Sequence, residues 1–136
     1  MPKKKSSTAK ISPARVLIIE DDEPTRDALV VKLAHMNIAA GTAKDGEEAI
    51  RKIHEQQWDV VIVDILLPKQ NGLTVLEEIR REPQCADATI FVFTNLCGAE
   101  HKGHALELGA HEFFEKTKIS LNDIAQKIAQ ALENKK

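Results

Sequence analysis

Residues 58–80 read WDVVIVDILLPKQNGLTVLEEIR, and this stretch decides the fold. Val60–Val63 is an unbroken run of β-branched residues, the pattern of a strand that is buried on both faces. Pro68 and the pair Asn71 and Gly72 then mark a loop. A helical pattern follows, and its apolar positions are Val75, Leu76 and Ile79. A strand, a loop and a helix in this order form the repeating unit of a parallel sheet.

The same unit recurs along the chain. Strand patterns are predicted at residues 16–19, 38–43, 60–63, 90–93 and 111–115. Helical patterns begin at Pro24, after Asp45, after Gly72 and after Ser120, and another spans 98–108. This alternation predicts an α/β fold with a parallel five-stranded sheet, helices on both faces and right-handed crossovers.

Length and charge indicate one domain that is preceded by a tail. A chain of 136 residues is expected to form one domain. Five of the 19 basic residues lie within residues 1–15, which hold no acid, so the rest has 14 basic against 21 acidic residues. We therefore expect a flexible basic tail over residues 1–14 and a domain over 15–136. An acidic body argues against a nucleic-acid-binding domain, which needs clustered basic side chains.

The sequence also bears on localisation. No apolar segment follows the basic N-terminus, and the longest apolar runs fall far short of the ~20 residues that a membrane helix needs. The two cysteines, Cys85 and Cys97, have no CxxC spacing and fit a reducing compartment. We expect a cytoplasmic protein that makes no membrane contact.

Polar side chains stand where the predicted strands end. These residues are Glu20, Asp21 and Asp22 after the first strand, Asp64 after the third, Thr94 after the fourth and Lys116 after the fifth. Ligands of open parallel sheets bind at this edge. Clustered carboxylates repel one another unless a cation lies between them, and Mg²⁺ prefers oxygen ligands. The pattern therefore predicts a Mg²⁺ site.

The same residues suit phosphoryl transfer. Asp64 can act as a nucleophile towards phosphorus when a cation and the ammonium of Lys116 lie beside it. Thr94 can donate a hydrogen bond to a phosphoryl oxygen. The metal and the lysine would neutralise charge on the transferring group.

Four stretches resemble the receiver domains of two-component response regulators: VLIIEDDEPTRDAL, WDVVIVDILLPKQNGLTVLEEIR, IFVFTNL and LELGAHEFFEKT. The resemblance covers residues 15–134, and Asp64, Pro68, Gly72, Thr94 and Lys116 follow the family's order. It implies a three-layer flavodoxin-like (βα)5 fold with strand order 2-1-3-4-5.

The resemblance also implies a role for each acidic residue. Asp64 would be the phosphoacceptor and a Mg²⁺ ligand. Asp21 would bind Mg²⁺ directly, Glu20 would bind it through water, and the backbone carbonyl of Leu66 would be a further ligand. Asp22 falls one position later and is interpreted as an acid that begins a helix.

Further residues correspond to phosphoryl-binding and switch positions. Thr94 and Lys116 would bind the phosphoryl oxygens, and Thr94 and Phe113 would form the switch. The family usually has proline after the lysine, whereas Thr117 stands here, so the geometry of the Lys116–Thr117 bond is left open.

The resemblance implies partners of two kinds. A sensor histidine kinase or a histidine phosphotransfer protein would supply the phosphoryl group. A downstream target would bind the helix at 98–108, the strand at 111–115 and the last helix, since no output domain follows. We expect no nucleic-acid partner and no enzymatic activity apart from self-catalysed phosphotransfer and dephosphorylation.

Three alternatives stay open. The chain could be a degenerate receiver that acts as a phosphorylation-independent scaffold. It could be a phosphatase with Asp64 as its nucleophile, although Leu66 stands where haloacid-dehalogenase-type enzymes carry an acid. Cys97, His101 and His104 share helical spacing and could contribute to a zinc site, but a fourth ligand is missing.

Overall fold

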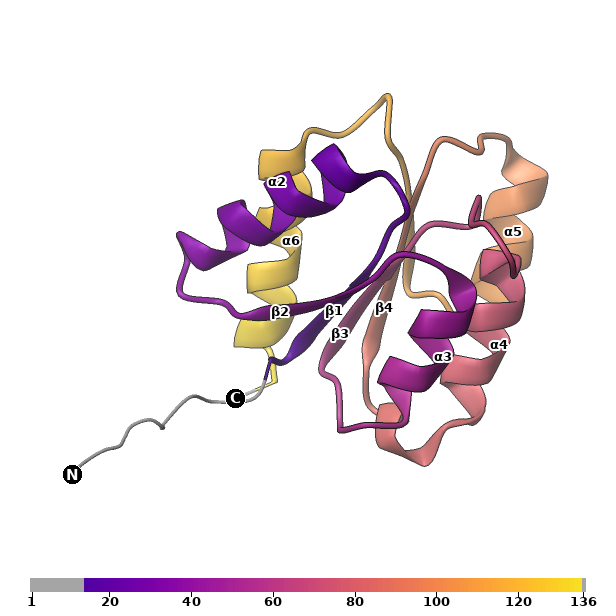
Figure 1. The fold of residues 1–136 in the computed structure, drawn as a ribbon. Helices are drawn as coiled ribbons and strands as arrows, with labels where there is room; N and C mark the ends of the chain where they lie inside the picture. Colours follow the sequence, from indigo (N-terminus) through magenta and orange to yellow (C-terminus); the bar gives the residue numbers. More distant parts are fainter. Residues whose placement is uncertain (1–13, 136) are drawn as a thin grey trace.

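The computed structural model describes residues 14–135, and its centre is a five-stranded parallel sheet (Figure 1). The strands are β1 (Val16–Ile19), β2 (Ala40–Ala43), β3 (Val60–Val63), β4 (Thr89–Thr94) and β5 (Glu112–Glu115). Their order in the sheet is β2-β1-β3-β4-β5, and every neighbouring pair is parallel. The predicted fold class and strand order are therefore confirmed.

Helices cover both faces of this sheet. They are α2 (Glu23–Ala34), α3 (Gly46–Ile53), α4 (Gly72–Arg81), α5 (Ala99–Glu107) and α6 (Leu121–Glu133), and a short 3-10 helix, η1, spans Pro83–Cys85. Figure 1 shows α2 and α6 on one face and α3, α4 and α5 on the other. The predicted tail over residues 1–14 lies outside the described residues except for Ala14.

Side-chain caps explain where four of the helices begin. Asp22, Asp45, Asn71 and Ser120 each accept a hydrogen bond from a backbone N–H in the first turn of the helix that follows. Asp22, for example, accepts from the N–H of Thr25 at 3.1 Å. The interpretation of Asp22 as the acid that begins a helix is therefore confirmed.

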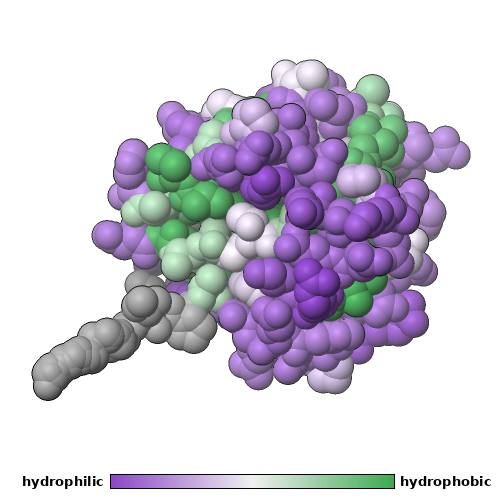
Figure 2. Space-filling view, in the orientation of Figure 1, coloured by the Kyte–Doolittle hydropathy of each residue, from purple (hydrophilic) through white to green (hydrophobic). Residues whose placement is uncertain are grey.

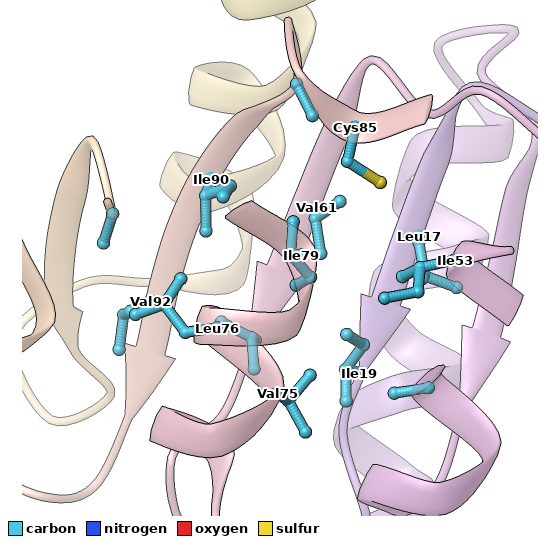
Figure 3. Packing of buried hydrophobic residues seen from close by; sticks show 14 of the residues in the cluster. Leu17, Ile19, Ile53, Val61, Val75, Leu76, Ile79, Cys85, Ile90 and Val92 are labelled. Carbon is cyan, nitrogen blue, oxygen red and sulfur yellow. The ribbon is translucent and has the colours of Figure 1, made fainter. Parts of the chain in front are cut away.

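Alternate residues of the central strands supply two separate cores. Val16 and Ile18 of β1 face the layer of α2 and α6, while Leu17 and Ile19 face the opposite layer. Figure 3 shows part of this second cluster, in which side chains of β1, β3 and β4 pack against side chains of α4. β1 and β3 are buried along their whole length because helices cover both of their faces.

The predicted boundaries differ from the structure where neighbours decide the outcome. The strand predicted at 38–43 begins at Ala40, because Ala40 is the residue that pairs with Val16. Asn37 adopts a positive φ of 63°, and the N–H of Ile38 bonds to the carbonyl of Leu33, so Ile38 closes the end of α2. The fourth strand extends by one residue at each end, and η1 was not predicted.

The surface is mostly polar on the face that Figure 2 draws, and its widest apolar part lies over α2 and the start of β2, with smaller apolar areas on the right of the view. Val31 of α2 is 52% exposed. Within residues 14–135, no helix combines the length and the apolar character that crossing a bilayer would require.

Candidate functional site

Backbone hydrogen bonds carry the sheet one residue past its strands and bring the polar residues to one edge. The N–H of Asp64 donates to Ile19 at 3.1 Å, and the N–H of Glu20 donates to Ala43 at 2.9 Å. The N–H of Lys116 donates to the carbonyl of Thr94 at 2.8 Å. Residues that are far apart in sequence therefore share the carboxyl edge of the sheet, where ligands of this architecture bind.

Asp64 lies at the centre of this edge and is 4% exposed. Its Oδ1 accepts hydrogen bonds from Thr94 Oγ1 at 2.6 Å and from the N–H of Leu66 at 3.0 Å. Its Oδ2 accepts from Lys116 Nζ at 3.0 Å. Because both oxygens have donors, the carboxylate is fixed in orientation and its negative charge is stabilised.

Lys116 is shared between two buried carboxylates. Its Nζ lies 2.7 Å from Glu20 Oε1 and 3.0 Å from Asp64 Oδ2. Burial alone would lower the pKa of Lys116, but the hydrogen bonds to Glu20 and Asp64 outweigh it and raise the pKa above its usual value. The ammonium therefore stays charged at neutral pH.

The pKa of Glu20 is raised above its usual value, because burial has the largest effect on it. The negative charge of Asp64 raises this pKa as well, while the hydrogen bond from Lys116 lowers it. Glu20 Oε2 also accepts from the N–H of Asp22 at 3.2 Å, so both of its oxygens have donors. Arg26, which the sequence did not single out, donates to the backbone carbonyl of Glu20 at 3.0 Å and holds the loop after β1.

The peptide bond after Lys116 is trans, because residues 14–135 contain no cis peptide bond. The N–H of Lys118 donates to the carbonyl of Glu115 at 2.9 Å, which closes a turn around Lys116 and Thr117. The lysine thus reaches Asp64 without a proline behind it.

Three acids lie close enough to bind one cation. Glu20, Asp21 and Asp64 each offer an oxygen within 4.8 Å of the others, and Asp21 is exposed while the other two are buried. Hard divalent cations take carboxylate oxygens, and an exposed ligand leaves room for water or a phosphate oxygen. The donor set therefore fits Mg²⁺. Leu66, at 50% exposure, borders this site, and its carbonyl stays a predicted ligand.

Gly72 lets α4 begin close to this edge. A Cβ built on Gly72 would lie 2.4 Å from the carbonyl oxygen of Asp64 and 2.4 Å from the Cα of Ile65. The N–H of Gly72 donates to the carbonyl of Ile65 at 2.9 Å. Any larger residue would push the loop that carries Asp64 away from the helix.

The remaining predicted residues lie elsewhere. Phe113 is half-buried on β5, against the core beneath α3, α4 and α5. Within the described part of the chain, Glu20, Asp21 and Asp64 form the only group of three potential metal ligands. Cys97, His101 and His104 do not come together, so the zinc interpretation is wrong: shared helical spacing does not bring side chains to one point.

The comparisons with known proteins agree with this geometry. The sequence profile of the response regulator receiver domain matches residues 16–129. The chain belongs to the response regulator receiver family. The CheY-like receiver domain from Methanospirillum hungatei has the same fold, with a TM-score of 0.81 and 24% identity over 90% of this chain and 96% of that one. A response regulator from Clostridium difficile gives a TM-score of 0.80 with 25% identity, over 88% and 96% of the two chains.

Curated relatives of this receiver are longer proteins. The probable transcriptional regulator ycf27 of Guillardia theta is 37% identical over 102 residues, which are 75% of this chain and 39% of the relative. The cyclic di-GMP phosphodiesterase of Thermotoga maritima is 34% identical over 123 residues, 88% of this chain and 31% of the relative. The name of the first runs against our expectation that nucleic acid plays no part, although it describes a protein of which this chain spans less than half.

Proposed function

We propose that this receiver accepts one phosphoryl group on Asp64 and signals through protein–protein contacts. One observation carries the proposal: the Asp64 carboxylate contacts both the hydroxyl of Thr94 and the ammonium of Lys116 while it belongs to an acidic cluster that suits Mg²⁺. A receiver needs a nucleophile, a hydroxyl donor and a fixed cation at one point, and these residues meet that need.

The chemistry is displacement at phosphorus. An oxygen of Asp64 bonds to phosphorus as the bond from phosphorus to the donor's imidazole nitrogen breaks, and that nitrogen keeps the electron pair and later takes a proton. Mg²⁺, held by Asp21, Asp64 and, through water, Glu20, would neutralise charge on the phosphoryl oxygens. Lys116 and Thr94 would turn from the Asp64 carboxylate to the new phosphoryl oxygens and hold them.

The donor is a sensor histidine kinase or a histidine phosphotransfer protein, and the output surface is formed by α5, β5 and α6. Four features support that surface. α5 buries only Ala105, it begins at Gly98 without a side-chain cap, and it follows β4, the strand that ends at Thr94. Phe113 lies half-buried on β5 beside it. Movement of Thr94 and Lys116 towards a phosphoryl group would shift both loops, and weakly held elements respond first.

Residues 15–136 would act as the receiver unit in the cytoplasm, with residues 1–14 as a tail. The alternatives have less support. A constitutive scaffold would not need Thr94 and Lys116 in contact with Asp64. A phosphatase would need an acid two residues after the nucleophile, and Leu66 has no titratable group.

Incubation with acetyl phosphate and Mg²⁺, followed by intact mass spectrometry, tests the proposal. We expect one added phosphoryl group that maps to Asp64, no addition in Asp64→Asn, and no addition when EDTA removes the metal. Asp27→Asn is the matched control, because Asp27 is an exposed acid of α2 outside the cluster. Modification of Asp64→Asn to the wild-type level would refute the assignment.

A further inference from the structure

Lys116 reaches Asp64 through a long side chain, and the position of its backbone does not by itself determine where Nζ lies. Its N–H is fixed by the carbonyl of Thr94, and the turn from Glu115 to Lys118 fixes the chain around it. Four side-chain torsions still lie between its Cα and its ammonium. A free lysine has large rotamer entropy, so any contact beyond the bonds to Glu20 and Asp64 restricts Nζ further before a phosphoryl group arrives.

The ring of Phe93 lies beneath this ammonium. Lys116 Nζ stands 5.6 Å from the centroid of the Phe93 ring, within the range of a cation–π contact. Phe93 is only 3% exposed and belongs to the core beneath α2 and α6. Because the ring is packed in this core, it offers the ammonium an apolar surface in addition to the two carboxylates.

We propose that Phe93 is a positioning residue for the phosphoacceptor site and holds the ammonium of Lys116 between Glu20 and Asp64. The inference rests on the proposed function, because it concerns the lysine that would bind the phosphoryl oxygens. Phe93 makes no contact with the reacting group. It restricts Lys116 to the rotamers in which Nζ stays at the carboxyl edge of the sheet, and so reduces the ordering that phosphoryl transfer requires.

The chain offers a matched control two residues earlier. Phe91 lies on the same strand and in the same core as Phe93, and it is equally buried at 3% exposure. Its ring packs edge-on against Phe114, with 5.6 Å between centroids, and not against Lys116. Phe91→Leu and Phe93→Leu therefore each remove one phenyl ring from the same core, and only Phe93→Leu removes the ring that contacts the Lys116 ammonium.

Two measurements separate positioning from stability. In wild-type protein, the ring current of Phe93 should shift the ε-methylene protons of Lys116 upfield in the NMR spectrum. We expect Phe93→Leu to lose this shift and Phe91→Leu to keep it, while both lower Tm. With acetyl phosphate and Mg²⁺, we expect the maximal phosphorylation rate constant to fall about two- to five-fold in Phe93→Leu only, the range that a cation–π contact of ordinary strength gives.

Phe93→Met serves as a second variant without a ring if Phe93→Leu folds poorly, and the same losses are expected. An unchanged Lys116 shift in Phe93→Leu or Phe93→Met would overturn the proposal. A lost shift with an unchanged rate, or an equal loss of rate in Phe91→Leu, would do the same. If the wild-type protein takes up no phosphoryl group, the proposed function fails, while the NMR shift still shows whether Phe93 holds the lysine.

Discussion

At the scale of single residues, the site is a balance of one ammonium against two buried carboxylates. Within residues 14–135, Lys116 is the only basic side chain that forms ion pairs with the carboxylates of Asp64 and Glu20. Burying two acids without a counter-charge is costly, so this lysine contributes to folding as well as to the proposed chemistry.

We predict that Lys116→Met lowers the free energy of unfolding at pH 7 by about 3 kcal/mol, because it leaves Glu20 and Asp64 buried and uncompensated. This loss of free energy of unfolding should become smaller as the pH falls below 7. Burial and Asp64 already raise the pKa of Glu20, so the folded variant binds a proton more tightly than the unfolded chain and gains stability as the pH falls below neutral.

Urea denaturation between pH 7 and pH 5 measures this effect. Lys118→Met is the control, because the Lys118 side chain is 74% exposed and, among the described residues, forms an ion pair with Glu115 alone. A Lys116→Met protein that is as stable as the control at pH 7 would show that the ion pair is energetically neutral.

At the scale of elements, Arg80 of α4 links three segments at the opposite edge of the sheet. Its Nη2 donates to the carbonyls of Ala88 and Cys85, which precede β4. Its side chain also lies against Gly109, in the turn between α5 and β5, where φ is +113°. The two ends of α5 therefore differ. The turn after α5 packs against Arg80 at Gly109, whereas the start of α5 at Gly98 has no side-chain cap.

Substitution of two glycines should therefore have opposite effects. In Gly109→Ala, the positive φ and a Cβ only 2.3 Å from Arg80 Cδ should cost about 1–3 kcal/mol of stability. In Gly103→Ala, nothing lies within 4 Å of the new Cβ, and the gain in helix propensity should add about 0.5–1 kcal/mol. Thermal denaturation of both variants is the measurement, and a neutral Gly109→Ala would contradict the packing described.

The pairing of β4 with β5 should depend on pH through His111. Its ring Nδ1 accepts from the backbone N–H of Ile90 at 3.0 Å, and the backbone N–H of His111 donates to the carbonyl of Ile90 at 2.8 Å. Although much of the residue faces solvent, burial of the ring nitrogen and the charges of Arg80 and Lys135 lower the pKa of His111. The folded state therefore disfavours the proton, and stability should be lost as the pH falls below about 6.5, the ordinary value for histidine.

Tm measured from pH 7.5 to pH 5.5 checks this. His111→Asn keeps an acceptor that does not titrate, so we expect a shallower loss than in the wild type. His111→Leu removes the acceptor and should lower Tm at every pH. An Asn variant with the wild-type slope would exclude His111 as the titrating group.

Much of the element structure could be predicted from local patterns. The β-branched run at Val60–Val63 and the caps at Asp45 and Ser120 carry their own physical signals, and the structure agrees with them. The convergence of Asp64, Thr94 and Lys116 followed from the rule that parallel strands end at one edge. The contact of Lys116 with Phe93 could not be predicted, because a phenylalanine in a buried strand predicts a core position but not which side chain it contacts.

At the scale of the whole molecule, cation binding should stabilise the fold. Binding to the native state alone adds about 2.7 kcal/mol at a free Mg²⁺ concentration one hundred times Kd. We expect Tm to rise with Mg²⁺, the rise to be largely lost in Asp21→Asn, and Asp27→Asn to behave as the wild type. A rise of equal size in Asp21→Asn would place the cation elsewhere.

The site draws on β1, β3, β4 and β5, which are spread from residue 16 to residue 115. Within residues 14–135, β5 is an edge strand that pairs with β4 alone, and Lys116 follows it directly. A nascent polypeptide that has left the ribosome only as far as β4 carries Asp64, the proposed acceptor, but not the ammonium of Lys116. Under the proposed function, such a chain could not complete the phosphoacceptor site before β5 pairs with β4 and brings Lys116 to the edge of the sheet.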